Sequence, residues 1–334
     1  MIFRILATFS IIAGSLCPAA AQERVTVGTM QQIANGALFL AAAKGYFKAE
    51  GLDVEITAYA SDQDVVEALA GNATDFGLAG FTATAFNLAG KGAIKAVAAQ
   101  VREKDGYEGN EIVVSNAAYA RGLRKAENIA NSSAAIGQLG TSLHYQLGQI
   151  ARLKGFDFTS ITLKPEGSFD AVARSVARGA ADVAILPGYY ARDLLTANQA
   201  KLVAWYSELD EQQLGALFAS AKTIASRRAM VEKFLRAYRR AAAEYSVAFL
   251  RHDRYGRRIS NAKSQEVAAA IARYLYPGRP LADSAAKVEA AIYFMDAQAQ
   301  LDIADITRQV AWYQSQGLVD KGVDAGAIVG LSFR

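Results

Sequence analysis

The pattern with the clearest ligand chemistry is the stretch GQLGTSLHY at residues 137–145. A predicted strand leads into glycines, and Thr141 and Ser142 stand where the next helix begins. Threonine or serine caps such a helix, and the free amides of its first turn attract an anion. We therefore predict an anion-binding turn at Gly140, Thr141 and Ser142, with His144 in reach of the same ligand. The alternative is an ordinary capped helix.

Three other loops place polar or aromatic side chains directly after predicted strands. Amides such as those of Gln31, Gln32 and Asn35 donate and accept hydrogen bonds in either orientation. Phe81 and Tyr189 offer apolar or stacking walls to an organic ligand. The alternatives are a solvated loop for the amides and a core position for the aromatic rings. The candidate ligand-binding residues of these loops are Met30, Gln31, Gln32, Asn35, Gly80, Phe81, Thr82, Pro187, Gly188 and Tyr189.

Several kinds of chemistry lack the residues they need. Cys17 is the only cysteine, so a chain processed after residue 21 has no disulfide, thiol nucleophile or thiolate metal ligand. The two histidines, His144 and His252, stand apart, and no HExxH, GxSxG, P-loop or GxGxxG motif occurs. We expect no catalytic residue, no metal and no cofactor. The basic stretches lack interleaved aromatic residues, which argues against nucleic acid as a partner.

The first 21 residues have the composition of a cleaved export signal. Arg4 is followed by about twelve largely apolar residues and then by three alanines at 19–21. This is the pattern of a secretory signal peptide, and it is too short for a membrane anchor. We predict cleavage after Ala21 and a periplasmic location.

The remaining chain, about 313 residues, exceeds what one hydrophobic core usually serves and suggests two domains. The formal charge of +4 is small and mixed along the chain, so it favours no class of partner. No later segment has eighteen consecutive apolar residues, and we expect a soluble protein.

The elements that position the candidate residues begin with residues 25–56. Val25 and Val27 alternate with polar residues as in a strand, an apolar helix follows at 37–47, and a turn leads into a second strand. A strand, a crossover helix and a second strand form a right-handed parallel unit. Ligands bind beyond the carboxyl ends of such strands, which places the loop of residues 29–36 at a ligand site.

The alternation of strand and helix recurs along the chain. The stretch that ends at Gly80 echoes the one that ends at Gly188, since each has a helix, a glycine, an aspartate (Asp75 or Asp182) and a buried strand. We infer two lobes built on similar units, which would face each other through their strand ends and enclose a cleft. Further strands are expected at residues 75–79, 94–100, 112–114, 134–137, 161–163, 182–186 and 202–206. Further helices are expected at residues 64–70, 84–88, 143–153, 169–177, 231–249, 265–274, 287–300 and 307–315.

Short stretches in a fixed order carry a family resemblance. They are NGALFLA at 35–41, KGYF at 44–47, EGL at 50–52, DFG at 75–77, GTS at 140–142, DVA at 182–184 and WY at 312–313. Their order resembles the periplasmic solute-binding proteins for nitrate, taurine and alkanesulfonates, a family that also includes thiamine-precursor binding proteins and synthases. The resemblance covers essentially the whole chain after the signal, and it does not specify a ligand.

The resemblance implies a two-lobed type 2 periplasmic binding protein fold of the α/β class, with a hinge and with a helical C-terminal tail packed on lobe 1. The expected boundaries are residues 1–21 for the signal peptide, 22–104 plus 208–334 for lobe 1, 105–207 for lobe 2, and hinge segments near 102–110 and 204–212. The ligand contacts that it implies fall at residues 30–32, 80–82 and 140–142, with 187–189 facing them.

The function that these observations favour is the extracytoplasmic solute-binding component of an ABC importer, and not an enzyme. The ligand would be a small organic anion, a sulfonate or carboxylate, although the same amides and hydroxyls suit nitrate or a neutral pyrimidine. Binding would close the hinge, and the closed monomer would dock on an inner-membrane permease. The alternatives are an enzyme of the pyrimidine or thiamine-precursor synthase type, whose cysteine-rich motif is absent, and a sensory binding protein that docks on a receptor.

Overall fold

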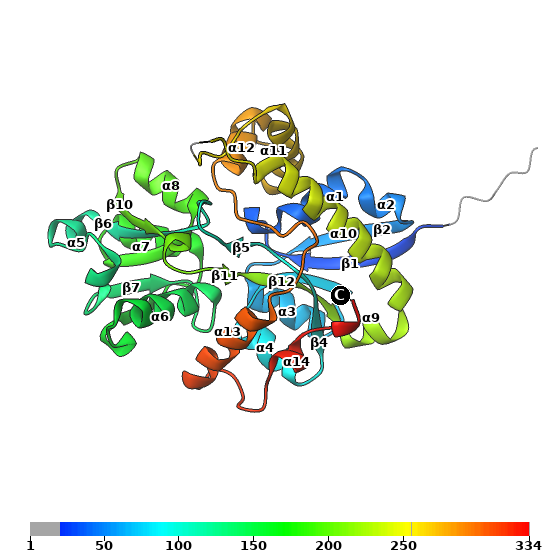
Figure 1. Cartoon of the computed structure of the whole chain (residues 1–334), viewed down its shortest axis with the longest axis horizontal. Helices are drawn as coiled ribbons and strands as arrows, with labels where there is room; N and C mark the ends of the chain where they lie inside the picture. The colour runs from blue at the N-terminus through cyan, green and yellow to red at the C-terminus, as the bar shows by residue number, and fades with distance from the viewer. Residues whose placement is uncertain (1–20, 255, 334) are drawn as a thin grey trace, which may run out of the picture.

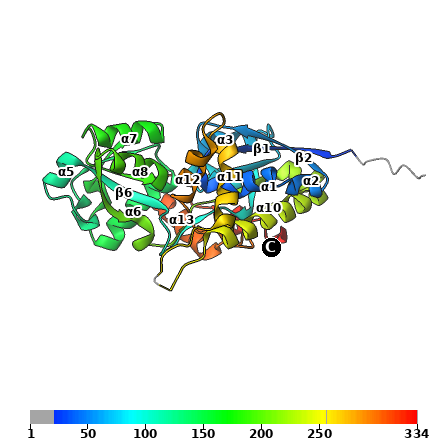
Figure 2. The ribbon, with the colours of Figure 1, turned by 90° about the horizontal axis from the view of Figure 1, so that it is seen from above.

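The structure is a computed structural model that describes residues 21–254 and 256–333, so most of the predicted signal peptide lies outside the described residues. Within these ranges the chain forms two five-stranded sheets, each covered by helices, and the two lobes lie side by side (Figures 1 and 2). No helix in the same ranges is long and apolar enough to cross a membrane.

The first sheet has the strand order β2-β1-β3-β12-β4. Its strands are β1 (Glu23–Thr29), β2 (Leu52–Ala58), β3 (Phe76–Gly80), β4 (Ile94–Ala99) and β12 (Gly215–Ser220). β1 runs parallel to both β2 and β3, which confirms the predicted parallel unit. β12 runs antiparallel between β3 and β4. The sequence analysis did not predict this central strand.

Two layers of helices cover the first sheet. One layer consists of α1 (Gly36–Ala43), α2 (Tyr46–Ala49), α10 (Arg228–Phe249) and α11 (Ala262–Leu275). The opposite layer consists of α3 (Asp62–Ala70), α4 (Ala83–Gly90), α13 (Ile303–Ser315) and α14 (Ala325–Ile328). The single helix predicted at residues 37–47 is wrong, because Gly45 has a φ of 69° and separates α1 from α2. Only glycine adopts that conformation readily.

The second sheet has the strand order β10-β6-β9-β7-β8. Its strands are β6 (Asn110–Ser115), β7 (Ser133–Ile136), β8 (Thr162–Pro165), β9 (Val183–Pro187) and β10 (Ala200–Trp205), close to the predicted positions. β7 is parallel to β8 and β9, whereas β6 is antiparallel to β9 and β10. The helices of this lobe are α5 (Asn116–Ala120), α6 (Ser142–Lys154), α7 (Phe169–Ala177) and α8 (Gly188–Thr196).

The remaining elements connect or extend the lobes. Between the two sheets, β5 (Arg102–Glu103) pairs antiparallel with β11 (Gln212–Gln213). The other helices are α9 (Ala221–Ser226) and α12 (Leu281–Glu289), and the single 3₁₀ turns are η1 (Ile33–Asn35), η2 (Ala126–Ile129), η3 (Phe158–Ser160), η4 (Tyr206–Glu208) and η5 (Leu331–Phe333).

The helix predicted at residues 287–300 is wrong. α12 ends at Glu289, and the chain then continues without a helix to residue 302. The Arg102 N–H donates to the Phe294 carbonyl at 2.9 Å, and the Ala99 N–H donates to the Ala299 carbonyl at 2.7 Å. These hydrogen bonds to β4 and β5 hold the segment in a non-helical path and override a spacing that locally resembles a helix.

Asp75 and Asp182 occupy matching places just before β3 and β9. Each aspartate accepts the backbone N–H of a residue on the neighbouring strand, Thr26 at 3.0 Å and Ser133 at 2.9 Å. Each aspartate N–H in turn donates to the hydroxyl of the same residue at 3.1 Å. The repeated sequence pattern therefore marks a repeated hydrogen-bonding arrangement at the amino ends of β3 and β9. It lies away from the carboxyl ends of these strands, which lead into the predicted ligand loops.

Candidate functional site

The carboxyl ends of the parallel strands of both sheets point towards the junction of the lobes. Two adjoining cavities, of about 140 Å³ and about 30 Å³, lie there. The outer cavity is lined by Met30, Ala60, Ser61, Asp62, Gly137, Gln138, Thr141, Gly167, Ser168, Phe169, Asp170 and Tyr190. The inner cavity is lined by Gln32, Ala34, Asp62, Gly80, Gln100, Asn110, Ser142, Leu143, Phe169, Pro187, Leu214 and Tyr293. Both lobes line both cavities, and we call the pair the interlobe cleft.

The structure brings six of the fourteen predicted ligand-binding residues to this cleft. Met30 and Thr141 line the outer cavity. The others line the inner cavity and are Gln32, Gly80, Ser142 and Pro187. These residues come from four loops that are far apart in the sequence. The prediction that the loops after the strands meet at one place is therefore confirmed.

Two predicted polar residues hold the first loop in shape and do not line the cleft. Asn35 is fully buried, its Nδ2 donates to the Met30 carbonyl at 2.9 Å, and its Oδ1 accepts Nε2 of Gln100. Gln31 points to the outside, where its Nε2 donates to the Tyr274 carbonyl at 3.3 Å. Asn35 thus positions Met30, while Gln31 joins the loop to α11.

Gly140 and His144 form an internal contact of the second-lobe turn. The Gly140 N–H donates to His144 Nδ1 at 3.0 Å, which places the imidazole proton on Nε2. Burial lowers the pKa of His144 to about 4, because a buried imidazole loses the hydration of its charged form. The Thr141 hydroxyl caps α6 by accepting the His144 N–H, so the predicted capped helix start is confirmed. Ser142 and Leu143 line the inner cavity, and none of the described hydrogen bonds uses their backbone amides.

The other predicted residues are built into packing around the cleft. Phe81 is fully buried and stacks on Phe86 at 5.3 Å between ring centroids. Thr82 caps α4 by accepting the Ala85 N–H at 3.0 Å. Gly188 begins α8, and Tyr189 packs against both Tyr190 and the core of the first lobe. α8 was not predicted, because Pro187 and Gly188 indicated a loop.

Several residues of the cleft were missed. Asp62 and Phe169 line both cavities, and each stands in the first turn of a helix that follows a strand. Applying the strand-end rule to β2 and β8 as well would have found both residues. Asn110 and Leu214 stand at the amino ends of antiparallel strands, which meet the same edge. They could not be placed without knowing that β6 and β12 run antiparallel.

The electrostatic character of the cleft differs from the expected anion site. Among the described residues that line its two cavities, none is a lysine, arginine or histidine, whereas Asp62 and Asp170 are acidic. Burial raises the pKa of Asp62, although the hydrogen bond from the Gly80 N–H at 2.9 Å acts in the opposite direction. Nowhere in the described ranges do three or more His, Cys, Asp or Glu gather as a metal site.

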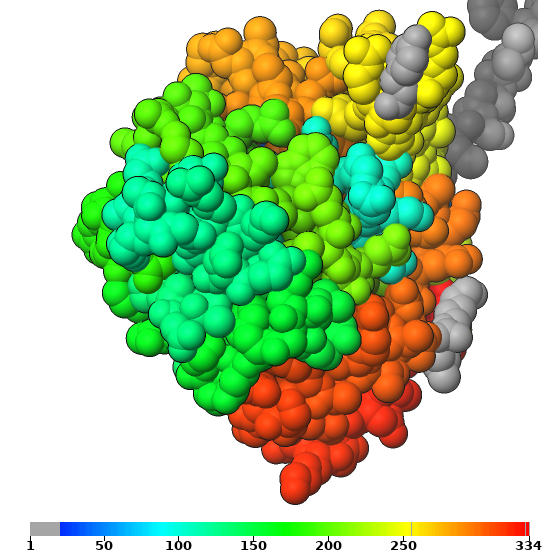
Figure 3. Space-filling view, turned by 60° about the vertical axis from the view of Figure 1, so that its left-hand side comes forward, coloured from blue at the N-terminus to red at the C-terminus, as the bar shows by residue number. Residues whose placement is uncertain are grey.

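The two lobes touch directly beside the cleft. The Ala83 N–H of the first lobe donates to the Gly140 carbonyl of the second at 2.8 Å. Tyr313 Oη on α13 lies 2.8 Å from the Thr141 carbonyl and 3.3 Å from that of Phe81. In Figure 3 the green second lobe meets the orange C-terminal tail along its lower edge. The tail therefore packs on the first lobe, as predicted, and also contacts the second.

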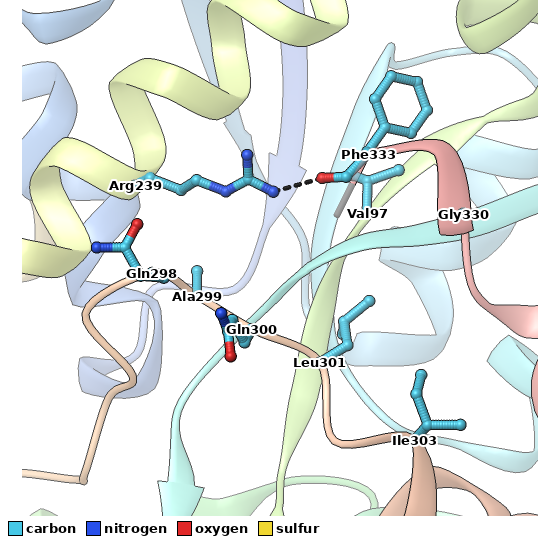
Figure 4. Close-up of a pocket in the computed structure, with 9 residues that line it drawn as sticks. All are labelled: Val97, Arg239, Gln298, Ala299, Gln300, Leu301, Ile303, Gly330 and Phe333. Carbon is cyan, nitrogen blue, oxygen red and sulfur yellow. Dashed lines mark hydrogen bonds between the residues drawn. The ribbon is translucent and has the colours of Figure 1, made fainter.

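A larger cavity, of about 410 Å³, lies elsewhere, between α10, the segment of residues 298–303 and the C-terminal turn (Figure 4). The first sheet and the tail supply its whole lining, and Arg239 at its edge already donates to the Phe333 carbonyl. The second lobe contributes nothing to it. We assign the candidate site to the smaller interlobe cleft, where both lobes and the strand ends converge.

Glu103 on β5 is a buried carboxyl group between the lobes. It is fully buried and accepts the Asn110 N–H at 3.1 Å and Gln146 Nε2 at 3.4 Å. Burial raises its pKa from the ordinary value of 4.5 to about 8. The folded protein therefore binds a proton at Glu103 more tightly than the unfolded chain does. The resulting contribution to the stability of the fold is present below about pH 4.5 and is lost as the pH rises from there to about 8.

We expect Glu103→Gln to remove this pH dependence. The free energy of unfolding of the variant, relative to the unmodified protein, should rise between about pH 4.5 and about pH 8 and then level off, because glutamine has no proton to lose. Denaturant titrations at several pH values measure this difference. Glu111→Gln is the matched comparison, since burial raises the pKa of Glu111 only to about 7 and its effect should level off at a lower pH. Parallel pH curves for Glu103→Gln and the unmodified protein would contradict the expectation.

The fold and the cleft define a class of protein. Solved structures that superpose on nearly the whole chain include the periplasmic aliphatic sulphonate binding protein SsuA of Escherichia coli, with 16% identity, 92% of each chain covered and a TM-score of 0.70. SsuA of Xanthomonas axonopodis pv. citri, an alkanesulfonate-binding protein bound to MOPS, has 19% identity, covers 93% of this chain and 99% of its own, and scores 0.66. The periplasmic nitrate-binding protein NrtA of Synechocystis PCC 6803 has 13% identity, 93% and 86% coverage, and a TM-score of 0.67. The chain therefore has the two-lobed periplasmic binding protein fold.

The family follows from the sequence itself. The model of the NMT1/THI5 like family matches residues 33–247, more than half of the chain, and the protein belongs to this family. No curated protein matches the chain.

Proposed function

We propose that this protein is the exported solute-binding component of an ABC importer, which holds a small organic molecule in the interlobe cleft. The observation that carries the proposal is that both lobes line the same two cavities, at the strand ends where α/β folds bind ligands. A predicted signal peptide and a fold shared with periplasmic binding proteins support export and a permease partner.

The mechanism that we propose is closure of the lobes about β5 and β11. These two short strands pair between the sheets, within or next to the stretches expected for a hinge. A solute that contacts both lobes binds the closed arrangement more tightly than an open one, and so shifts the population towards it. The direct contact of Ala83 with Gly140 belongs to the closed arrangement.

The predicted anionic ligand has limited support from the cleft. The Gly140 amide is already bonded to His144, so an anion would depend on the amides of Ser142 and Leu143 at the start of α6. These amides and the helix dipole favour negative charge. Asp62 and Asp170 oppose it, and no basic side chain among the lining residues offsets them.

Thermal unfolding with a broad solute panel tests the proposal. The panel contains sulfonates, aliphatic and aromatic carboxylates, nitrate, pyrimidines and amines. A compound at a hundred times its dissociation constant should add about 2.7 kcal/mol to the stability of the folded protein. Failure of every compound to raise the unfolding temperature would contradict solute binding.

Two tryptophan substitutions locate the binding site of any compound that stabilises the protein. Ser142→Trp fills the inner cavity of the interlobe cleft and should abolish the stabilisation. Gln298→Trp narrows the larger cavity of the first lobe and should leave it unchanged. The opposite result would move the binding site to that larger cavity and away from the lobe junction.

A further inference from the structure

Asp62 is a carboxylate held at the centre of the interlobe cleft. It lines both cavities and stands in the first turn of α3, where its Oδ1 accepts the Gly80 N–H at 2.9 Å. A Cβ at position 80 would come within 2.9 Å of Oδ2. Because position 80 is a glycine, no side chain there crowds Oδ2 of Asp62 beside the cavity. No hydrogen bond of the described residues uses this oxygen.

Asp62 lacks the basic side chain that normally pairs with a partly buried carboxylate. No described residue forms an ion pair with Asp62, and the described lining of the two cavities contains no basic side chain. Burial raises the pKa of the Asp62 carboxyl because nothing of opposite charge replaces its lost hydration. Such an unpaired charge destabilises a protein unless a partner compensates it, and a positively charged ligand is that partner.

Aromatic rings border the same space. Phe169 lines both cavities, Tyr190 lines the outer one, and their ring centroids are 5.7 Å apart. The face of an aromatic ring attracts a cation that lies within about 6 Å of its centroid. A carboxylate beside two such rings is a combination that recognises a protonated or quaternary amine, whereas it repels a sulfonate or a carboxylate.

We propose that the interlobe cleft selects a small organic cation, a solute whose protonated or quaternary nitrogen pairs with Asp62 beside the rings of Phe169 and Tyr190. The proposal rests on the solute-binding function proposed above and names the class of solute. Ser142 and Leu143 line the inner cavity, and their backbone amides, which none of the described hydrogen bonds uses, would serve a hydrogen-bond acceptor elsewhere on the same solute.

Matched ligand series measured by calorimetry test the charge preference. Butyl and benzyl skeletons are each offered as the amine, the alcohol, the carboxylate and the sulfonate, and choline is added as a quaternary amine. We expect each amine to bind at least about tenfold more tightly than the carboxylate of the same skeleton. Asp62→Asn should weaken amine binding at least about tenfold and change alcohol binding less than about threefold.

Asp62→Asn is a conservative test, because asparagine keeps an oxygen that can accept the Gly80 N–H. Thermal unfolding without ligand shows whether the variant is folded. Glu67→Gln, on an exposed carboxylate of the same helix that lines neither cavity, is the matched control and should leave amine binding within about threefold.

The outcomes separate this inference from the proposed function. Tighter binding of a carboxylate or sulfonate than of its matched amine would overturn the cation assignment and leave solute binding intact. Unchanged amine affinity in folded Asp62→Asn would overturn the role of Asp62. If no compound of the matched series or of the broad panel binds, the proposed function and the inference are both overturned.

Discussion

Replacement of Gly148 by valine is expected to weaken solute binding about tenfold or more while each lobe stays folded. Gly148 lies on α6 of the second lobe, and a Cβ there would come within 2.2 Å of Cζ2 of Trp312 on α13. Trp312 cannot move aside easily, because its ring packs against His144, Tyr145 and Phe158 at centroid distances of 5.1 to 5.9 Å.

The steric overlap of a valine side chain at position 148 with Trp312 would change the arrangement of the two lobes. α13 packs on the first lobe and α6 belongs to the second, so the simplest relief is to move the lobes apart. Overpacking typically costs about 1–3 kcal/mol, and 1.4 kcal/mol corresponds to a tenfold change in affinity. A solute that requires contact with both lobes loses this amount when the closed arrangement becomes less stable.

Two measurements check the Gly148 prediction. Calorimetry with a compound from the panel gives the affinity, and small-angle X-ray scattering gives the radius of gyration, which should increase in the variant. The double variant Gly148→Val with Trp312→Ala should recover most of the affinity, because the smaller side chain leaves room for valine. Leu153→Ala, on an exposed residue of the same helix, is the control. Unchanged affinity and an unchanged radius in Gly148→Val would show that the helix contact does not govern closure.

Phe234→Ala is expected to destabilise the first lobe by about 3–5 kcal/mol, the range for removing a large buried aromatic side chain. Phe234 on α10 is fully buried, and its ring centroid lies 4.1 Å from that of Phe76 on β3 and 4.6 Å from that of Phe47 on α2. The ring joins the C-terminal helices to the sheet and to the N-terminal helical unit. Its loss leaves a cavity among three elements that cannot all move inwards.

Denaturant unfolding, followed by circular dichroism, measures the loss in Phe234→Ala. Val247→Ala is the matched control, since Val247 lies on the same helix but is 63% exposed, and it should change stability by less than about 0.5 kcal/mol. A loss below about 1 kcal/mol in Phe234→Ala would contradict the view that α10 is an integral part of the first lobe.

The sequence predicted much of the fold because its signals are local. Caps such as Thr141, glycine turns and the alternation of apolar residues each act within a few positions, and they placed most strands and helices correctly. The strand β12 was not predicted, because residues 215–220 are buried on both faces and show no alternation of apolar and polar residues. Its partners, β3 and β4, lie more than a hundred residues earlier in the chain.

The candidate site was likewise predicted only in part. Sequence reasoning found the loops after β1, β3, β7 and β9, because parallel strands carry ligand loops at their carboxyl ends. Which side chains of those loops face the cleft depended on tertiary packing. Asn35 and His144 became supports of the loops, whereas Gln32 and Ser142 reached the inner cavity.

By itself, the sequence determined that the chain forms two α/β lobes with strand-end loops, since hydrophobic period, capping and turn residues are encoded within short stretches. The turn at residues 137–145 was its strongest ligand signal, and it forms a capped helix start at the cleft. Only the tertiary structure decided the charge of the cleft. Asp62 reaches the cavities through the pairing of β2 with β1 and through its bond to Gly80, and no local pattern specifies contacts across such distances.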